Sequence, residues 1–158
     1  MTIVEAAEVR QRLTMPVCID LMRASLRELE GGTYTQPLRS IALLPGGEKF
    51  GFMPACLGDC FGAKVLSAFP QNAGTQYPSH IGYVLLFEGE HGSFLGMADA
   101  AVITEIRTGA VSGVATDLLA RPDAHRLAII GAGAQGRSHL AAMTAVRDIH
   151  SVTVYDQN

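Results

Sequence analysis

Three glycines toward the end of the chain have the spacing of a dinucleotide-binding loop. Gly131, Gly133 and Gly136 form a complete G-x-G-x-x-G pattern. In such a loop the first glycine permits a tight turn, and the second lets the backbone approach a pyrophosphate closely. The third lets the following helix pack against the preceding strand. The N–H groups at the start of that helix then face the anion, and the helix dipole assists binding.

The elements that position this loop are predicted on both sides of it. The apolar run Leu127–Ile130 predicts a buried strand, Ala134–Val146 a helix, and Val152–Tyr155 a second strand. Asp156 follows, 25 residues after the first glycine, where a carboxylate can accept hydrogen bonds from ribose hydroxyls. The acid favours NAD over NADP, because a 2′-phosphate would face a negative charge, although NADP is possible. An ordinary glycine-rich turn is the alternative interpretation.

Three cations are predicted on apolar faces outside this segment. Strand alternation places Arg39 on the same face as Ile41. It likewise places Lys64 on the face of Leu66, and helical spacing places Arg107 in an apolar stripe. Burying a cation without an anion is costly, so the three side chains indicate a pocket for a carboxylate. Alternatively, each cation pairs with a nearby acid or extends its charged end into solvent.

Composition excludes several classes of protein. With 48% hydrophobic and 17% charged residues, the 158-residue chain can bury a core, in one domain or two small ones. A net charge of −3 without a basic run argues against nucleic-acid binding. No apolar stretch approaches membrane-spanning length, and a signal-peptide pattern is absent at the start. We therefore expect a cytoplasmic protein without nucleic-acid or membrane partners.

The cysteines do not predict a metal site. Cys18, Cys56 and Cys60 form no disulfide framework. Cys56 and Cys60 have a loosely metal-like spacing but lack a second pair of ligands, so we interpret them as free thiols and expect no metal.

The remaining pattern predicts a different kind of domain before the nucleotide-binding segment. Residues 1–30 show helical spacing that ends at Gly31 and Gly32, and residues 36–94 show strands and turns of a mainly antiparallel sheet. A long helix rich in small residues is expected at residues 101–120, where small side chains permit close approach to neighbouring backbone. The predicted strands are Leu38–Leu44, Lys49–Ala55, Ala63–Phe69, Ile81–Glu88 and Phe94–Met97.

Four stretches of the chain resemble the ornithine cyclodeaminase/mu-crystallin family. They read GAKVLSAFPQN at 62–72, PSHIGYVLLF at 78–87, ITEIRTGAVSGVA at 103–115 and LAIIGAGAQGRSH at 127–139. The stretches follow the family's order, and the resemblance covers nearly the whole chain. IRTGAVSG followed by IIGAGAQG is a specific combination, so the chain is identified as similar to this family.

The resemblance implies an α/β fold in two parts. Residues 1–105 would form an α+β domain for substrate binding and dimerisation. Residues 106–158 would form the start of a Rossmann domain, a doubly wound parallel sheet that binds NAD or NADP. The implied activity is hydride transfer between nicotinamide and the alpha carbon of an amino acid or cyclic imino acid, as in ketimine reductases and amino-acid dehydrogenases. The alternatives are ornithine cyclodeaminase proper, which forms proline and ammonia, and a non-catalytic mu-crystallin-like binding protein.

The resemblance also implies roles for single residues. Lys64 matches the active-site lysine, and Arg39 and Arg107 match carboxylate-binding arginines, so these three would bind the substrate. Ser79 matches a hydroxyl position beside the cofactor. The cofactor-binding residues would then be Ser79, Gly131, Gly133, Ala134, Gln135, Gly136 and Asp156.

Two departures from the family pattern qualify these assignments. The residues just after Gln135 and the strand after Lys64 differ from those of ornithine cyclodeaminases proper, which puts ornithine in doubt as the substrate. A nucleotide-binding half also needs a third parallel strand, and the family's catalytic aspartate would follow Asn158. The chain is therefore expected to be the N-terminal part of a longer enzyme and to be inactive alone.

Overall fold

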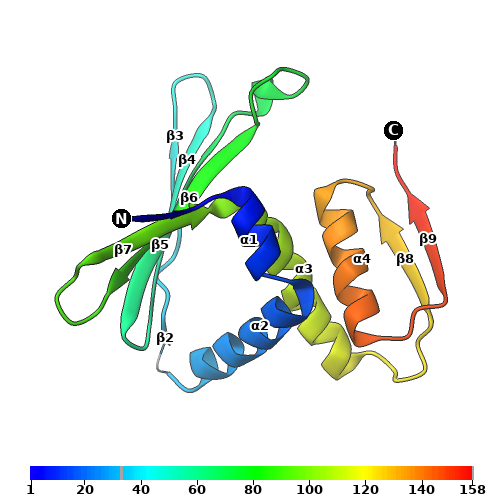
Figure 1. Ribbon diagram of the computed structural model, residues 1–158. Coiled ribbons are helices and arrows are strands. Elements are labelled where there is room, and N and C mark those ends of the chain that lie inside the picture. The colour runs from blue at the N-terminus through cyan, green and yellow to red at the C-terminus, as the bar shows by residue number, and fades with distance from the viewer. Residues whose placement is uncertain (33, 158) are drawn as a thin grey trace. The chain divides into compact units, whose positions relative to one another are not determined.

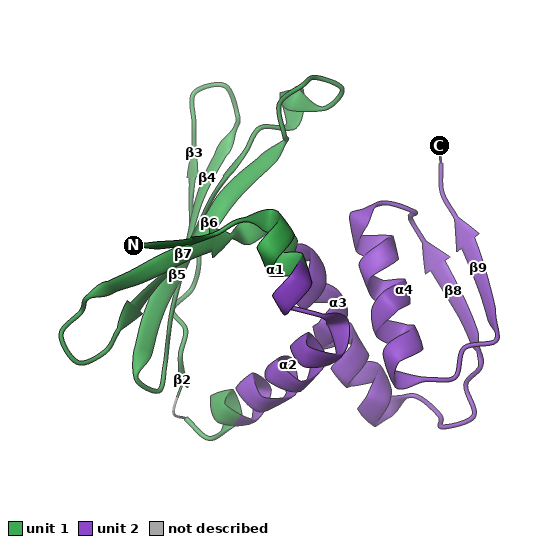
Figure 2. Cartoon of the chain, viewed as in Figure 1, with its two compact units in different colours: residues 1–10, 28–102 green, residues 11–27, 103–158 purple. Residues whose placement is uncertain are grey.

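Figure 1 shows the protein as a computed structural model that describes residues 1–32 and 34–157. Its contacts form two compact units, which Figure 2 colours separately. Residues 1–10 and 28–102 make up unit 1, and residues 11–27 and 103–158 make up unit 2. The expected boundary at residue 105 lies close to the division after Val102. Residues 11–27, however, group with unit 2, because their helix shares its core.

Unit 1 is built on one mixed sheet. The strands have the order β1-β7-β6-β5-β4-β2, and β3 also pairs with β4. Strand β1 is parallel to β7, and the other pairs are antiparallel, as the pattern of residues 36–94 predicts. The strands are β1 Thr2–Val4, β2 Tyr34–Thr35, β3 Ser40–Leu43, β4 Lys49–Leu57, β5 Cys60–Ala68, β6 His80–Glu88 and β7 Phe94–Asp99, and a short 3-10 helix, η1 Pro70–Asn72, follows β5.

The first strand corrects the prediction of a helical pattern from residue 1. Thr2–Val4 pairs with β7 in the register Thr2 to Gly96, and helix α1 begins only at Ala6 and ends at Arg12. A Cβ at Gly96 would collide with the Thr2 carbonyl oxygen, so the missing side chain lets β1 approach β7. Three β-branched residues favour a strand but are too few to show an alternating pattern.

An interruption in strand pairing lies beside β4. Strand β3 pairs with residues 49–52 and β2 with Cys56 and Leu57, so neither covers Pro54 on that edge. Proline has no N–H to donate, and such an interruption is where a strand tolerates it. Arg39 precedes β3 in the segment that passes this interruption.

Unit 2 contains most of α2 Met15–Glu30 and α3 Ala100–Leu119, followed by β8 Arg126–Ile130, α4 Ala134–Val146 and β9 Ser151–Tyr155. Its core is formed by the buried residues Cys18, Ile19, Ala110 and Val114. This core joins α2 to α3, which is why the contacts place α2 in unit 2.

Small residues bring α3 close to α4, as their number in the sequence predicts. A Cβ at Gly109 would lie 2.5 Å from Ser138 Oγ, and one at Gly113 would lie 3.4 Å from the Cβ of Ala142. A side chain at Gly109 would push α3 and α4 apart, whereas one at Gly113 would press most closely on Ile19 of α2, at 3.2 Å.

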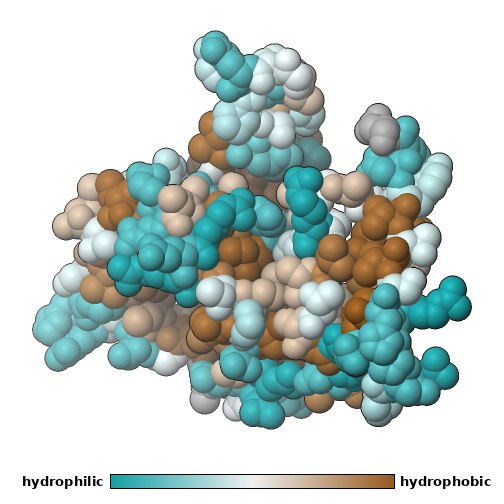
Figure 3. All heavy atoms as spheres, turned by 45° about the vertical axis from the view of Figure 1, so that its right-hand side comes forward, coloured by the Kyte–Doolittle hydropathy of each residue, from teal (hydrophilic) through white to brown (hydrophobic). Residues whose placement is uncertain are grey.

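Large apolar side chains remain exposed. Figure 3 shows hydrophobic patches on the face that it displays. On the sheet of β8 and β9, Ile130 is 89% exposed, and Val154 and Tyr155 are also exposed. Contiguous exposed apolar side chains indicate interaction surfaces. None of the helices among residues 1–32 and 34–157 is long and apolar enough to cross a membrane.

Candidate nucleotide and substrate sites

The glycine loop has the strand–turn–helix geometry that its spacing predicts. Strands β8 and β9 are parallel, in register from Arg126 with Ser151 to Ile130 with Tyr155. The Gly131 N–H donates to the Tyr155 carbonyl at 2.7 Å and so extends the pairing beyond β8.

Each glycine of the loop meets a different requirement. Gly131 has φ +99°, a left-handed conformation that favours glycine. A Cβ at Gly136 would collide with the Gly131 carbonyl oxygen, so this position must be glycine for α4 to pack. Gly133 has φ −70°, and a Cβ there would meet no atom within 4 Å. None of the residues that the structure describes, 1–32 and 34–157, therefore demands glycine at 133, whereas close approach of a ligand would.

The start of α4 presents a positive electrostatic end. Gly133 is its N-cap residue and makes no side-chain capping bond, and the first turn contains no acidic residue. Ala134 and Gln135, which begin the helix, are exposed. Unpaired N–H groups and the helix dipole make such an end suited to an anion.

Arg137 is a residue that the sequence analysis missed. Its Nη1 donates to the Ala132 carbonyl at 3.4 Å, so its guanidinium returns to the loop. The signal was available, because long side chains in a helix point toward its N-terminus. A cation here adds to the attraction for a pyrophosphate.

Asp156 joins the end of β9 to the loop. Its Oδ2 accepts the Ala132 N–H at 2.5 Å, and the residue is partly buried. This bond holds the carboxylate beside the loop, at the position where the fingerprint requires an acid. A carboxylate offers several acceptor positions, so the bond is compatible with further hydrogen bonds to hydroxyl groups.

Side chains behind the loop tie α4 to α3. Ser138 Oγ donates to the Glu105 carbonyl at 2.7 Å. His139 Nδ1 lies 2.7 Å from the Gln135 carbonyl, and its Nε2 lies 3.0 Å from Ser112 Oγ. A carbonyl only accepts, so Nδ1 carries the proton; in the neutral ring Nε2 is then an acceptor for the Ser112 hydroxyl, which also lies 3.4 Å from the Thr108 carbonyl oxygen. These bonds steady the first turns of α4.

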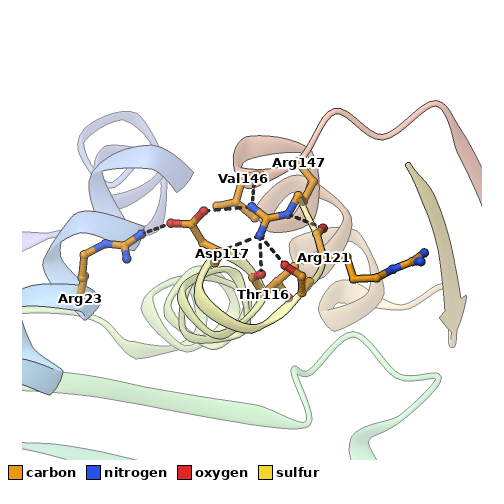
Figure 4. Close-up of polar contacts among 7 residues, drawn as sticks. Arg23, Thr116, Asp117, Arg121, Val146 and Arg147 are labelled. Atoms are coloured by element: carbon orange, nitrogen blue, oxygen red, sulfur yellow. Dashed lines mark hydrogen bonds and ion pairs between the residues drawn. The ribbon is translucent and has the colours of Figure 1, made fainter. Parts of the chain in front are cut away.

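Arg147 closes the other end of α3. Figure 4 shows its guanidinium among the carbonyl groups at that helix end. Nη2 donates to the carbonyls of Thr116, Asp117 and Ala120 at 3.0, 2.8 and 3.0 Å. Nη1 also pairs with Asp117 Oδ1 at 3.0 Å, and Arg23 binds Oδ2 at 2.7 Å. Hydrogen bonds from Arg23 and Arg147 hold the pKa of Asp117 below its ordinary value.

Lys64 lies in unit 1, on the face of the sheet that strand alternation predicts. Lys64 pairs with Met53 on one side and with Val84 on the other, and it is half-buried. Opposed residues in antiparallel strands share a face, so Lys64 lies between two apolar side chains.

Arg39 lies one residue before β3, which begins at Ser40 rather than at the predicted Leu38. Ser40 pairs with Phe52, and the same register continued by one residue sets Arg39 opposite Met53. Met53 also pairs with Lys64, but Arg39 itself is unpaired in the sheet, so a face shared by the two cations stays a prediction. Arg39 is exposed.

Arg107 and Ser79 are placed within their own units. Arg107 is exposed on α3 in unit 2. Burial raises the pKa of the Cys18 thiol, and the nearby charge of Arg107 opposes that rise. Ser79 lies in unit 1 just before β6, with its hydroxyl 3.2 Å from His80 Nδ1. A meeting of Arg107 with Arg39 and Lys64, or of Ser79 with a cofactor, stays a prediction.

Comparisons with known proteins point to one family. Residues 1–158 match the sequence model of the ornithine cyclodeaminase/mu-crystallin family. A Delta(1)-pyrroline-2-carboxylate reductase of Bacillus cereus is 31% identical over 160 residues, which cover 99% of this chain and 49% of the relative. The ketimine reductase mu-crystallin of Mus musculus is 36% identical over 129 residues, which cover 80% of this chain and 41% of the relative.

A solved structure matches the whole described fold. It is the Delta(1)-pyrroline-2-carboxylate reductase of Thermococcus litoralis in complex with NADH and L-proline, with a TM-score of 0.94 and 35% identity. The match covers 100% of this chain and 50% of that one. The chain thus spans about half the length of the curated relatives that it matches.

Proposed function

The chain belongs to the ornithine cyclodeaminase/mu-crystallin family, and from this premise we propose that the protein is an NAD(P)-dependent reductase of cyclic imino acids. It moves hydride between nicotinamide and the alpha carbon of an amino or imino acid. The observation that carries the proposal is the glycine loop, in which a Cβ at Gly133 would contact none of the residues that the structure describes. A dinucleotide pyrophosphate at the start of α4 accounts for it.

The residues present fit a dinucleotide. Gly133 admits close approach, the exposed start of α4 offers N–H groups, and Arg137 adds a positive charge. Asp156 would accept the ribose hydroxyls. The bound nicotinamide would supply the hydride chemistry, and the protein would supply position and charge.

The cations of the sheet would hold the substrate. Arg39 and Arg107 would bind its carboxylate, because a guanidinium pairs with a carboxylate through two parallel hydrogen bonds. Lys64 would bind beside the reacting carbon. Its cross-strand neighbours Met53 and Val84 are apolar, and with the substrate bound they would limit water around the ammonium group and so strengthen its electrostatic interactions.

Two alternatives to this function are a cyclodeaminase and a binding protein without turnover. A cyclodeaminase would release ammonia from an amino acid with an amine side chain, and the departure from the cyclodeaminase pattern after Gln135 argues against it. A binding protein without turnover would keep the loop but show no reaction. We also propose a homodimer, which the exposed apolar residues of the first sheet, among them Phe50, Phe52 and Ile81, support. A cytoplasmic location remains an expectation from the sequence.

The direct test is a screen for turnover. The purified full-length protein, rather than the 158-residue chain alone, is incubated with NADH or NADPH and a set of cyclic imino acids, and oxidation of the nucleotide is followed by absorbance. The reverse reaction is tested with NAD and proline-like amino acids, and ammonia is measured with diamino acids. Loss of absorbance with a cyclic imine supports the proposal. Ammonia release alone favours the cyclodeaminase, and nucleotide binding without turnover in any arm contradicts an enzyme.

The choice between nucleotides is tested at Asp156. We expect NADH to bind about tenfold or more tightly than NADPH, because a 2′-phosphate would meet the carboxylate. Asp156→Ala should narrow this ratio, as measured by titration calorimetry. Asp123→Ala, which changes an exposed acid outside the loop, is the control. Equal affinities in the unmodified protein would show that Asp156 does not select the cofactor.

A further inference from the structure

A cluster of two histidines and an aspartate lies at the end of the β8–β9 sheet opposite to the glycine loop. His125 precedes β8, and Asp148 and His150 precede β9. Because the two strands are parallel, their first residues meet at one edge of the sheet, whereas the loop follows the last residue of β8. One ligand atom from each of the three residues can be chosen so that all lie within 4.8 Å of one another.

The backbone holds His125 in a metal-binding tautomer. His125 Nδ1 lies 2.7 Å from the carbonyl oxygen of Asp148. That oxygen only accepts, so Nδ1 carries the proton and Nε2 keeps its lone pair. Histidines that bind metal commonly donate their other N–H to a backbone carbonyl in this way. The N–H of His150 donates to the His125 carbonyl at 2.8 Å, which fixes the two segments side by side.

Asp148 and His150 already lie near the spacing of two ligands on one ion. His150 Nε2 is 3.0 Å from Asp148 Oδ2. In a tetrahedral site with bonds of about 2.0–2.1 Å, neighbouring ligand atoms are about 3.3 Å apart.

Binding requires one rearrangement, which exposure permits. The rings of His125 and His150 are stacked, with centroids 4.4 Å apart and planes 6° from parallel. An ion cannot lie in both ring planes while they are stacked, so one ring must turn. The His150 side chain is 62% exposed and that of Asp148 is 81% exposed, so both can move without disturbing a core. His125 would stay in place through its bond to the Asp148 carbonyl.

We propose that His125, Asp148 and His150 form a binding site for a divalent transition-metal ion, with Zn²⁺ as the probe. Two imidazoles and one carboxylate suit Zn²⁺, Ni²⁺ or Cu²⁺ rather than Mg²⁺ or Ca²⁺, which prefer oxygen ligands alone. The ion links the starts of β8 and β9, and water completes its coordination. Since it binds the folded arrangement, it stabilises the pairing of the strands that carry the nucleotide loop.

The sequence analysis expected no metal site because the cysteines lack a second pair of ligands. The proposed site differs from that expectation and uses histidines and an aspartate instead. His125 lies 25 residues before His150 in the sequence. Only the parallel pairing of β8 with β9 brings these residues together, so no local spacing reveals the site.

The test uses the full chain without a histidine tag, freed of metal by a chelator. Zn²⁺ is titrated by calorimetry, and thermal unfolding is recorded with and without the ion. We expect one equivalent to bind and to raise Tm. His125→Gln, Asp148→Asn and His150→Gln should each weaken binding about tenfold or more and abolish the rise in Tm. Co²⁺ absorption provides a second readout, because tetrahedral Co²⁺ has a distinctive spectrum.

Two controls separate this site from other ligands on the surface. His91→Gln removes an exposed histidine of unit 1, and a double change of Cys56→Ser and Cys60→Ser removes the sheet thiols. Both variants should bind Zn²⁺ as the unmodified chain does. Circular dichroism of the metal-free variants checks that each is folded. Unchanged Zn²⁺ affinity in the three cluster variants, or no binding by the unmodified chain, would overturn the proposal.

Discussion

The glycine loop and the cations of the sheet differ in how far apart their parts lie in the sequence. The loop, its two strands and Asp156 occupy one continuous segment from Arg126 to Asp156. Turn and helix start are set there by local backbone geometry, and the acid is brought to the loop by the pairing of the adjacent strands β8 and β9. Arg39, Lys64 and Arg107 come instead from three elements, and two of them belong to unit 1. The function of a continuous motif can thus be predicted from its spacing, whereas the positions of dispersed residues depend on how strands pair and elements pack.

Strand register is the reason for the difference. The predicted shared face of Arg39 and Lys64 depends on how β3, β4 and β5 pair. A slip of one residue in either pair would turn one of the cations to the opposite face. The glycine loop has no comparable dependence, since the strand and the helix that flank it adjoin it directly.

The largest expected loss of stability comes from removing the Arg147 contacts that hold the segment from Arg126 to Asp156 against the end of α3. Arg147 follows α4, and its side chain is only 11% exposed. Arg147→Ala removes the donors for the last carbonyls of α3 and a partner of Asp117. We expect a loss of about 3 kcal/mol in the free energy of unfolding, because several part-buried acceptors lose a charged donor together.

Arg121→Ala is the matched control, because its side chain is 81% exposed and pairs with Asp123 at the surface. Such a surface pair contributes little, so Tm should stay nearly unchanged. Chemical denaturation of both variants gives the two free energies. Equal losses would mean that Arg147 does not act through its buried contacts.

The second prediction separates two glycines of the loop. Gly136→Ala places a Cβ against the Gly131 carbonyl oxygen, so the strand and helix must move apart. We expect it to lower stability by about 2–3 kcal/mol, as overpacking does. Gly133→Ala adds a methyl group that meets no protein atom. It should leave Tm within a degree or two of the unmodified value but weaken NADH binding about tenfold or more.

Thermal unfolding and NADH titration of both variants make the comparison. Unchanged NADH affinity in Gly133→Ala would contradict the interpretation that a ligand approaches this glycine. A large fall in Tm for the same variant would show an internal requirement instead.

The third prediction concerns the dispersed cations. In the full-length protein, Arg39→Ala should raise KM for a carboxylate substrate by a factor that corresponds to about 1.5–3 kcal/mol, the range for a charge-assisted hydrogen bond. Lys64→Met, which keeps the apolar neighbours of the strand, should lower kcat as well, because Lys64 is proposed to act at the reacting carbon. Lys49→Met, at the start of β4, is the control and should change neither constant. Unchanged kinetics in Arg39→Ala would remove that residue from the site.

What the sequence could predict follows the same division. The helix Ala134–Val146 has the predicted bounds, and β8 and β9 each begin one residue earlier than predicted. The short strand β1 could not be predicted, because it is held by pairing with β7, far away in the sequence. The role of Arg147 was hidden for the same reason, since its partners lie about 30 residues earlier.

The last prediction has the smallest expected effect and concerns the turn between β6 and β7 in the sheet of unit 1. Glu88 ends β6, and its carboxylate accepts the N–H groups of Ser93, His91 and Glu90 at 2.7–3.1 Å across the hairpin to β7. Bonds from Ser93 and His91 above all lower the pKa of Glu88 from 4.5 to about 2. A lowered folded-state pKa means that this contribution to stability is complete above pH 4.5 and declines as the pH falls toward about 2. Thermal unfolding of Glu88→Gln and the unmodified protein should therefore differ most near pH 7 and converge in acid. Glu90→Gln, which changes an exposed neighbour in the same turn, should show no such convergence. If the difference in Tm between Glu88→Gln and the unmodified protein is constant from pH 7 to pH 3, the charge of Glu88 does not stabilise the hairpin. The turn would then depend, like the strands around it, on distant pairing alone.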